Sequence, residues 1–169
     1  MPGLVPKRHA ASPFASLVPF LHAGRDSVLS NVTDAFTLPG SPLISLALFA
    51  VGCRVLWLRG EPGAAVLWAG AFVVGNVAEI VAKSLVARPA LYADSIHLGG
   101  FDHSYPSGHM LRSALVAALA WRLAPRAAPY ALALAAVSAV MLVVGGWHTP
   151  SDVAGALILA GFLVAAAPR

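Results

Sequence analysis

Five long apolar segments dominate the sequence and limit what the chain can fold into. They run approximately over Pro42–Leu58, Gly63–Ala82, Gly108–Leu123, Tyr130–Trp147 and Val153–Ala167. A helix that crosses a bilayer needs about 20 apolar residues, so flanking residues must complete the shorter segments. Only 11% of the 169 residues are charged and 59% are hydrophobic, whereas soluble domains carry about 25% charged residues. The sequence therefore predicts an all-α, polytopic membrane helical bundle with about five transmembrane helices.

Short connections separate most of these segments, with the sequences RGEPG, RLAPRAAP and HTPSD. Because a short connection makes neighbouring helices antiparallel, consecutive segments should cross the membrane in alternating directions. No internal repeat or low-complexity linker interrupts them. We therefore interpret residues 41–169 as one transmembrane domain, and nothing in the sequence fixes its oligomeric state.

The first 40 residues have a different pattern, and we expect a flexible start followed by an amphipathic helix in the membrane interface. Helical spacing in DSVLSNVTDAFTL separates an apolar face from a polar one, namely Val28, Leu29, Val32 and Phe36 against Asp26, Ser30, Asn31 and Asp34. A signal peptide is disfavoured because Pro19 interrupts the apolar run and polar residues follow it closely. A sixth, poorly formed span is the alternative for residues 1–40.

Polar residues at the ends of the apolar segments are the candidates for function, because ionisable groups in a membrane are costly unless they are used. They fall into three clusters, which are Glu79, Lys83 and Arg88, then Ser107, His109 and Arg112, and finally His148 and Asp152. If consecutive helices are antiparallel, all three clusters reach the same side of the membrane. The sequence thus predicts one polar site at one end of the bundle.

Each cluster also has a purely structural interpretation. Lys83 is able to extend to the interface as many membrane lysines do, and Arg88 precedes a proline, which is common at a helix exit. Pro-Ser-Gly-His is compatible with an ordinary turn before a helix. HTPSD fits a capping box with Thr149 as N-cap and Asp152 at the third helical position. The common location of the clusters is what favours a functional site.

The expected chemistry at this end is the binding of a phosphate group. Ser107 and Gly108 lie where a helix begins, so backbone N–H groups and the helix dipole favour an anion there. Lys83 and Arg88 add positive charge at the same level, which strengthens hydrogen bonds to phosphoryl oxygens.

Two histidines supply candidates for catalysis. Asp152 follows His148 by four residues, which is close enough to fix the tautomer of the imidazole and strengthen its other nitrogen as a nucleophile. His109 is then available as a general acid for the leaving oxygen.

A metal site is the competing interpretation, and further ligands in the loop before Ser107 would be Asp94, His97, Asp102 and His103. Their spacing matches no reliable zinc pattern, and the nearby cations disfavour a metal ion. We therefore predict no metal and no cofactor. A basic cluster with interleaved aromatic residues is also missing from the sequence, so nucleic acid is not an expected partner.

The three clusters resemble the motifs of the type-2 phosphatidic acid phosphatase superfamily, membrane lipid phosphatases related in their active site to vanadium haloperoxidases. Pro106, Ser107, Gly108 and His109 match its second motif in full; His148 and Asp152 match the end of the third, and Lys83 the start of the first. The resemblance implies a metal-independent phosphohistidine mechanism in which His148 is the nucleophile, Asp152 orients it and His109 is the general acid. It also implies that Lys83, Ser107 and Gly108 hold the phosphoryl oxygens.

The sequence departs from this family at two arginines. The first motif has Arg-Pro where this chain has Ala90 and Leu91, although an Arg-Pro pair begins two residues earlier, at Arg88. The third motif opens with Ser-Arg where this chain has Met141 and Leu142. A relocated arginine, a different substrate and lost activity are the three explanations.

Arg112 is one candidate for the relocated arginine. It follows His109 by three residues and so shares its helix face. An arginine within an apolar run needs a partner, and we expect either a bound phosphate or Glu79 from the preceding segment. We favour the phosphate and predict that Arg88 and Arg112 contribute to phosphate binding, with Glu79 in a structural role.

The expected substrate is a lipid phosphate or diphosphate that enters from the membrane, such as phosphatidic acid, phosphatidylglycerol phosphate or a polyprenyl phosphate or diphosphate. A lipid-phosphate binder without activity, a transporter and a phosphoryl transferase are the alternatives. Basic residues gather at the opposite ends of the segments, at Arg54, Arg59, Arg122, Arg126 and Arg169. Because basic loops prefer the cytoplasm, we expect a bacterial plasma-membrane protein whose active site is extracytoplasmic, although Lys7, Arg8 and Arg25 oppose this orientation.

Overall fold

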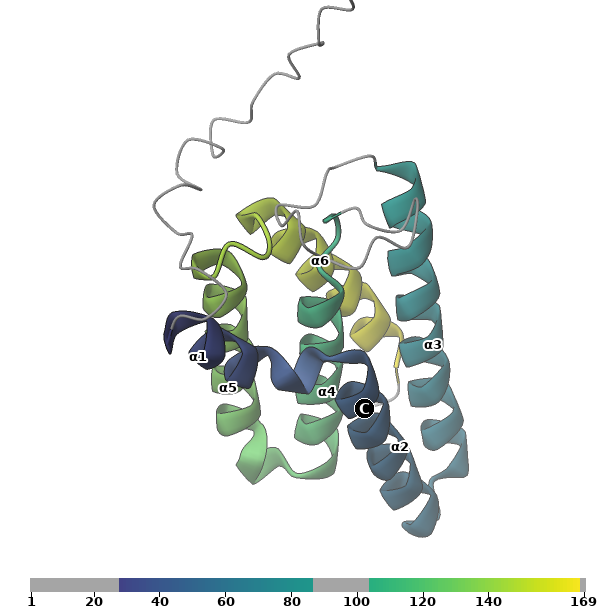
Figure 1. The fold of residues 1–169 in the computed structure, drawn as a ribbon. Helices are drawn as coiled ribbons and strands as arrows, with labels where there is room; N and C mark the ends of the chain where they lie inside the picture. Colours follow the sequence, from purple (N-terminus) through teal and green to yellow (C-terminus); the bar gives the residue numbers. More distant parts are fainter. Residues whose placement is uncertain (1–27, 87–103, 168–169) are drawn as a thin grey trace, which may run out of the picture.

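The structure is a computed structural model and describes residues 28–86 and 104–167. Its regular elements are all helical (Figure 1), which confirms the predicted all-α class. They are α1 (Val28–Thr37), α2 (Pro42–Leu58), α3 (Pro62–Leu85), α4 (Gly108–Leu123), α5 (Ala128–Val144) and α6 (Pro150–Ala166), with short 3-10 turns η2 (Leu38–Gly40) and η3 (Pro125–Ala127). Helices α2 to α6 overlap the five predicted segments, and α5 begins and ends two to three residues earlier than predicted.

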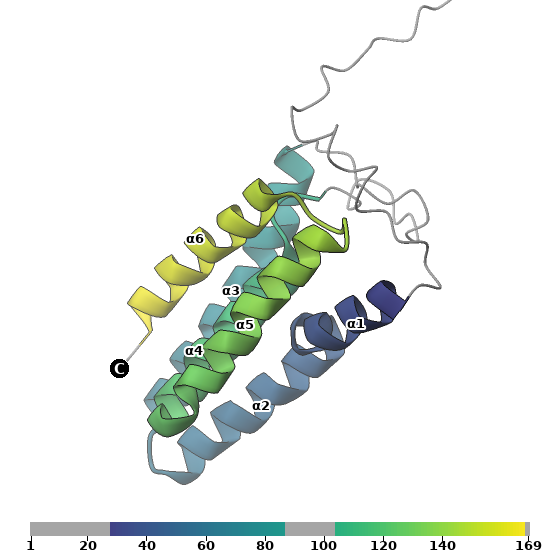
Figure 2. The same cartoon turned by 90° about the vertical axis from the view of Figure 1, so that its left-hand side faces the viewer.

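Helix α4 is the centre of the bundle. It contacts every other helix, and Figures 1 and 2 show α2, α3, α5 and α6 arranged around it. The side chains of Met110, Leu111, Leu115 and Leu119 are buried along its length. Its 16 residues span only about 24 Å at 1.5 Å per residue, which is less than the hydrocarbon core. Of the residues of α4, only Trp121 is exposed, so the neighbouring helices cover most of its surface.

Three stretches of the described residues are long and apolar enough to span a membrane, namely Asn31–Leu58, Pro62–Leu85 and Pro125–Val144. Helix α6 is apolar but shorter. The outside of the bundle is apolar, with side chains such as Leu43, Leu85 and Phe162 more than 70% exposed, whereas the charged Glu79 and Asp152 are buried. Apolar surface outside and charge inside is the arrangement expected of an integral membrane protein.

Helix α1 packs against α5 and lies across the bundle (Figure 1). Thr33 and Thr37 are buried, whereas Val32 and Phe36 on the predicted apolar face are more than a third exposed. A helix of ten residues is about 15 Å long and too short to span a bilayer. The exposed apolar face supports the predicted interfacial position, which remains a prediction, and residues 1–27 lie outside the described residues.

Candidate active site

Residues from the three polar clusters meet at one end of the bundle. Figure 1 shows the last turns of α3, the start of α4 and the connection between α5 and α6 all at its upper end. Lys83 belongs to the last turn of α3, His109 to the first turn of α4, and His148 to the connection that precedes α6. Arg88 lies outside the described residues, as do the loop residues proposed as alternative metal ligands.

The connection between α5 and α6 begins with a tight helix ending. Gly146 has a φ of +74°, a left-handed conformation that glycine adopts without steric cost. Its N–H donates to the carbonyl of Val143, and the N–H of Trp147 donates to the carbonyl of Leu142, at 3.0 Å each. This pair of bonds is the Schellman motif. It ends α5 at Val144, earlier than predicted, and fixes the backbone that leads to His148.

The start of α6 is the predicted capping box. The Asp152 N–H donates to Thr149 Oγ1 at 3.3 Å, and the Thr149 N–H donates to Asp152 Oδ2 at 2.9 Å. The same Oδ2 lies 3.7 Å from His148 Nδ1. The structural and the functional interpretations of HTPSD are therefore compatible, because one buried carboxylate caps the helix and faces the imidazole.

The His148–Asp152 distance is longer than a hydrogen bond. Nδ1 of His148 is buried and has no hydrogen-bond partner among the described residues, so the Asp152 carboxylate is the group placed to accept a hydrogen bond from the Nδ1–H. Catalytic hydrogen bonds are commonly long before substrate binds and shorten in the complex. The imidazole itself is 12% exposed, which leaves part of the ring accessible to a substrate.

The Pro-Ser-Gly-His segment is held directly against α6. The Ser107 N–H donates to the carbonyl of Asp152 at 3.1 Å, and Gly155 lies so close to the Tyr105 ring that a Cβ there would approach it to 2.5 Å. Ser107 Oγ caps α4 by accepting from the N–H of Met110 at 3.3 Å. These contacts couple the second and third motifs through the backbone.

Both the N–H and the side-chain oxygen of Ser107 already have protein partners. The oxygen acts as an acceptor in its bond, so the hydroxyl hydrogen is the group of Ser107 that could be donated to a phosphate. The first N–H groups of a helix have no intrahelical acceptor, so those of Gly108 and His109 remain as backbone donors for an anion. A direct contact between Ser107 and a phosphate remains a prediction.

Glu79 joins two of the predicted cations. Its Oε1 lies 2.8 Å from Lys83 Nζ, and its Oε2 lies 2.9 Å from Arg112 Nη1. Arg112 Nη1 also donates to Asn76 Oδ1 at 3.1 Å, and its Nε donates to the carbonyl of Gly40 at 2.8 Å. Glu79 is therefore a partner of Arg112, as the structural interpretation of this arginine predicts. The Asn76 side chain and the Gly40 carbonyl are two further acceptors that the sequence does not indicate.

His109 lies among the same charges. It interacts electrostatically with His148, Arg112, Glu79 and Lys83. The candidate general acid is therefore near both the candidate nucleophile and the Glu79 pairs.

A group of three or more His, Cys, Asp and Glu side chains with metal-binding geometry is not found in residues 28–86 and 104–167.

Leu142 occupies the position where the family motif has arginine, and it is a core residue. Its side chain is 2% exposed and packs in the main hydrophobic cluster. The Arg112 guanidinium instead contacts α3 and η2. That Arg112 takes the place of the arginine missing at position 142 therefore stays a prediction, and Ala90, the other departure, lies outside the described residues.

Gly108 makes room for the Glu79 carboxylate. A Cβ on Gly108 would collide with both carboxylate oxygens and with Cδ of Glu79. We expect Gly108→Ala to lower the free energy of unfolding by about 1–3 kcal/mol, as overpacking does. The control is Gly70→Ala, because a Cβ on Gly70 meets nothing within 4 Å and alanine favours a helix by about 1 kcal/mol. Thermal unfolding in detergent compares them, and equal stability of the two variants would contradict the close approach.

Comparison with known proteins agrees with this architecture. Residues 62–169 match the model of the PAP2 superfamily, and because this is more than half of the chain, the protein belongs to that superfamily. A similar solved structure is the crystal structure of the first transmembrane PAP2-type phosphatidylglycerolphosphate phosphatase from Bacillus subtilis. The TM-score is 0.71 at 21% identity, over 89% of this chain and 81% of that chain. Comparison with curated proteins gives no match.

The family resemblance inferred from the motifs is therefore confirmed, and so is the fold class. At the level of the family, the protein is a membrane-embedded lipid phosphatase.

Proposed function

We propose that this protein hydrolyses a phosphomonoester or diphosphate of a membrane lipid through a phosphohistidine formed on His148. The observation that carries the proposal is the direct coupling of two motifs. Asp152 faces His148 with its carboxylate and accepts the Ser107 N–H with its backbone carbonyl. Candidate substrates are phosphatidic acid, phosphatidylglycerol phosphate and polyprenyl phosphates or diphosphates.

In the proposed first step, His148 Nε2 attacks phosphorus and the bond to the lipid oxygen breaks. His109 gives its proton to that oxygen as it leaves. Asp152 accepts the Nδ1–H of His148 and stabilises the positive charge that develops on the ring. In the second step, His109 takes a proton from water, the water attacks the phosphohistidine, and phosphate leaves with His148 regenerated.

Binding of the phosphoryl group is assigned to the cations and N–H groups around His109. Lys83 is 20% exposed and shares Glu79 with Arg112, so a phosphate would compete with Glu79 for the two cations. The N–H groups of Gly108 and His109 are the backbone donors at the start of α4. We retain the proposal that Arg112 and Arg88 assist, with Arg112 acting from its site beside Glu79.

The test is release of phosphate by the purified full chain from a panel of these lipids, with and without a metal chelator. We expect release from at least one lipid and no loss on chelation, because histidine supplies the nucleophile. His148→Ala is the control for contaminating phosphatases. Release that a chelator abolishes would overturn the histidine mechanism, and no release from any lipid would favour a binder or a transporter.

The role of His109 has its own signature. His109→Ala should slow hydrolysis of an alkyl phosphate by about 10²–10⁴-fold, the usual contribution of general acid catalysis. An aryl phosphate with a good leaving group needs no proton in the bond-breaking step, so the variant should hydrolyse it with a much smaller loss. Equal losses for both kinds of ester would contradict the assignment.

We also propose that the active site is extracytoplasmic and that the membrane is a bacterial plasma membrane, because the arginine-rich end of the bundle should face the cytoplasm. Single cysteines at Leu85 and Ala127, in a Cys53→Ser background, report on the two ends. Leu85 is 78% exposed, and Ala127 ends η3 at the opposite end. We expect an impermeant thiol reagent to label intact cells at position 85 only, and labelling at 127 only would reverse the orientation.

A further inference from the structure

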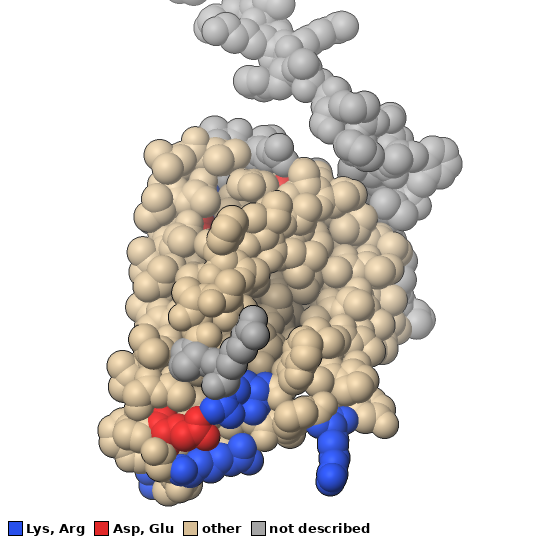
Figure 3. All heavy atoms as spheres, turned by 180° about the vertical axis from the view of Figure 1, so that it is seen from behind, with Lys and Arg blue, Asp and Glu red and all other residues tan. Residues whose placement is uncertain are grey.

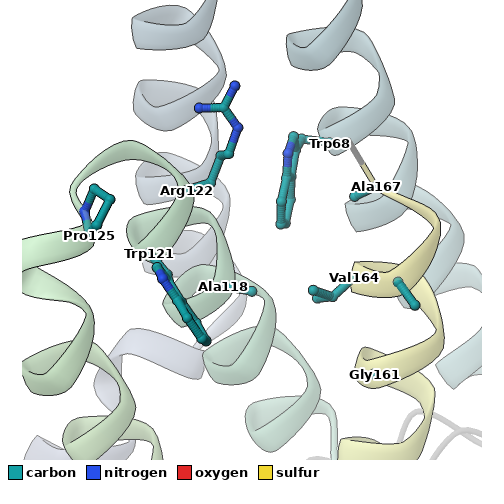
Figure 4. Close-up of a pocket in the computed structure, with 9 residues that line it drawn as sticks. Trp68, Ala118, Trp121, Arg122, Pro125, Gly161, Val164 and Ala167 are labelled. Carbon is teal, nitrogen blue, oxygen red and sulfur yellow. The ribbon is translucent and has the colours of Figure 1, made fainter. Parts of the chain in front are cut away.

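A cavity of about 670 Å³ lies between α3, α4 and α6, at the end of the bundle opposite the candidate active site. Its wall includes Ala118 and Trp121 of α4 and Gly161 and Val164 of α6 (Figure 4). Trp68 and Arg122 complete the wall. Sites for small ligands are typically apolar clefts of this size with a few polar groups.

Two N–H donors at this cavity lack partners. Trp68 Nε1 and Arg122 Nε are buried and have no hydrogen-bond acceptor in the part of the chain that the structure describes. The Trp68 side chain belongs to a residue that is only 3% exposed. A buried donor without an acceptor costs about 1–3 kcal/mol, so an occupant with acceptor oxygens would be favoured here. Figure 4 shows the two side chains on either side of the upper part of the pocket.

This end of the molecule is positively charged. Figure 3 shows blue side chains gathered at the lower end of the molecule, with red beside them. Within the described ranges, Arg54, Arg59, Arg122 and Arg126 lie at this end, and Glu61, which accepts from Arg122 Nη2, is the acidic residue beside them. The exposed rings of Trp57 and Trp121 lie at the same level, as expected at a membrane interface. The charge therefore favours an anionic headgroup beside an apolar chain.

We infer that this cavity binds one anionic phospholipid from the leaflet opposite the active site. Its phosphate accepts from Arg122 Nε and Trp68 Nε1, and one acyl chain occupies the space beside Gly161 and Val164. The inference does not depend on the proposed catalytic mechanism, because the cavity and the catalytic residues share no side chain. According to this inference, the arginines at this end bind a phospholipid headgroup in addition to setting the orientation of the protein in the membrane.

Tryptophan quenching tests the site in the full chain. We use a protein that keeps only Trp68, with Trp57→Phe, Trp121→Phe and Trp147→Phe, reconstituted in nanodiscs. The probes are brominated phosphatidylglycerol and brominated phosphatidylcholine, titrated into unlabelled phosphatidylcholine. We expect both lipids to quench Trp68 fluorescence in a saturable way. Half of the quenching should be reached at a mole fraction about fivefold lower for phosphatidylglycerol than for phosphatidylcholine, because one cation near a membrane surface favours an anionic lipid by about this factor.

Two pairs of variants isolate the pocket. Arg122→Gln should abolish the preference for the anionic lipid, whereas Arg126→Gln, the same change outside the pocket, should leave it intact. Gly161→Leu should fill the cavity and remove saturable quenching by both lipids, whereas Gly70→Leu should not, since a Cβ on either glycine meets nothing within 4 Å. Equal quenching by the two lipids, or saturable quenching that survives Gly161→Leu, would overturn the inference. Protection of Trp68 from quenching by both lipids, accompanied by a dimer, would overturn the inference and assign the cavity to a second copy instead.

Discussion

Replacing His148 with alanine is expected to reduce phosphate release by about 10⁴-fold or more, the scale seen when an activated nucleophile is removed. The physical reason is that the Asp152 carboxylate faces this imidazole, with Oδ2 3.7 Å from Nδ1. The variant should fold normally, because His148 Nδ1 makes no hydrogen bond among the described residues and the Schellman motif is made by backbone groups. The measurement is phosphate release with matched thermal unfolding.

Asp152→Asn provides the matched comparison. Asparagine keeps an oxygen that accepts the Thr149 N–H, so the capping box and the stability of α6 should be retained. The loss of negative charge beside His148 should still lower kcat by about 10²–10⁴-fold. Wild-type turnover in His148→Ala, or a loss of activity in Asp152→Asn that follows unfolding instead of charge, would contradict these roles.

The second large effect is expected at Arg112. Arg112→Ala leaves the carbonyl of Gly40 and the amide oxygen of Asn76 without their donor, and leaves Glu79 with one cation fewer. Breaking a buried pair in this way costs about 3–5 kcal/mol, so the melting temperature should fall strongly. Arg122→Ala is the control, because the Arg122–Glu61 pair is partly exposed and exposed pairs contribute about 1 kcal/mol or less.

A double variant separates stability from phosphate binding at this position. Glu79→Gln combined with Arg112→Met removes both charges of the buried pair. The melting temperature should recover in part, because no buried charge of that pair is left alone, while the Gly40 carbonyl and the Asn76 oxygen still lack their donor. If Arg112 also binds phosphate, the stable double variant should keep a KM raised at least about tenfold, equivalent to about 1.4 kcal/mol. Recovery of stability together with wild-type kcat and KM would restrict Arg112 to a structural role.

Features set by neighbours in the sequence could be predicted. The capping box and the His148–Asp152 pair depend on spacings of three and four residues, which a helix start fixes locally. The five apolar segments follow from hydrophobicity and length, and all five form helices. The end of α5 was predicted too late, although two consecutive glycines, Gly145 and Gly146, are a signal for a helix ending.

Features set by packing could not be predicted. The Gly40 carbonyl binds an arginine 72 positions away, and no local pattern indicates that η2 packs onto α4. The buried threonine face of α1 is a second example, because helical periodicity separates an apolar face from a polar one but does not indicate which face contacts protein. In a membrane the apolar face meets lipid, so polar residues such as Thr33 and Thr37 turn toward the bundle.

The most direct test of the account is the site of phosphorylation during turnover. The full chain is mixed with a lipid phosphate labelled on its phosphorus, stopped in alkali and digested for mass spectrometry, because a phosphohistidine survives base and is lost in acid. We predict label on the peptide that carries His148, and a larger amount of it in His109→Ala when an aryl phosphate is used, since water attack then lacks its general base. Label on another residue, or steady phosphate release with no labelled protein, would contradict a mechanism through His148.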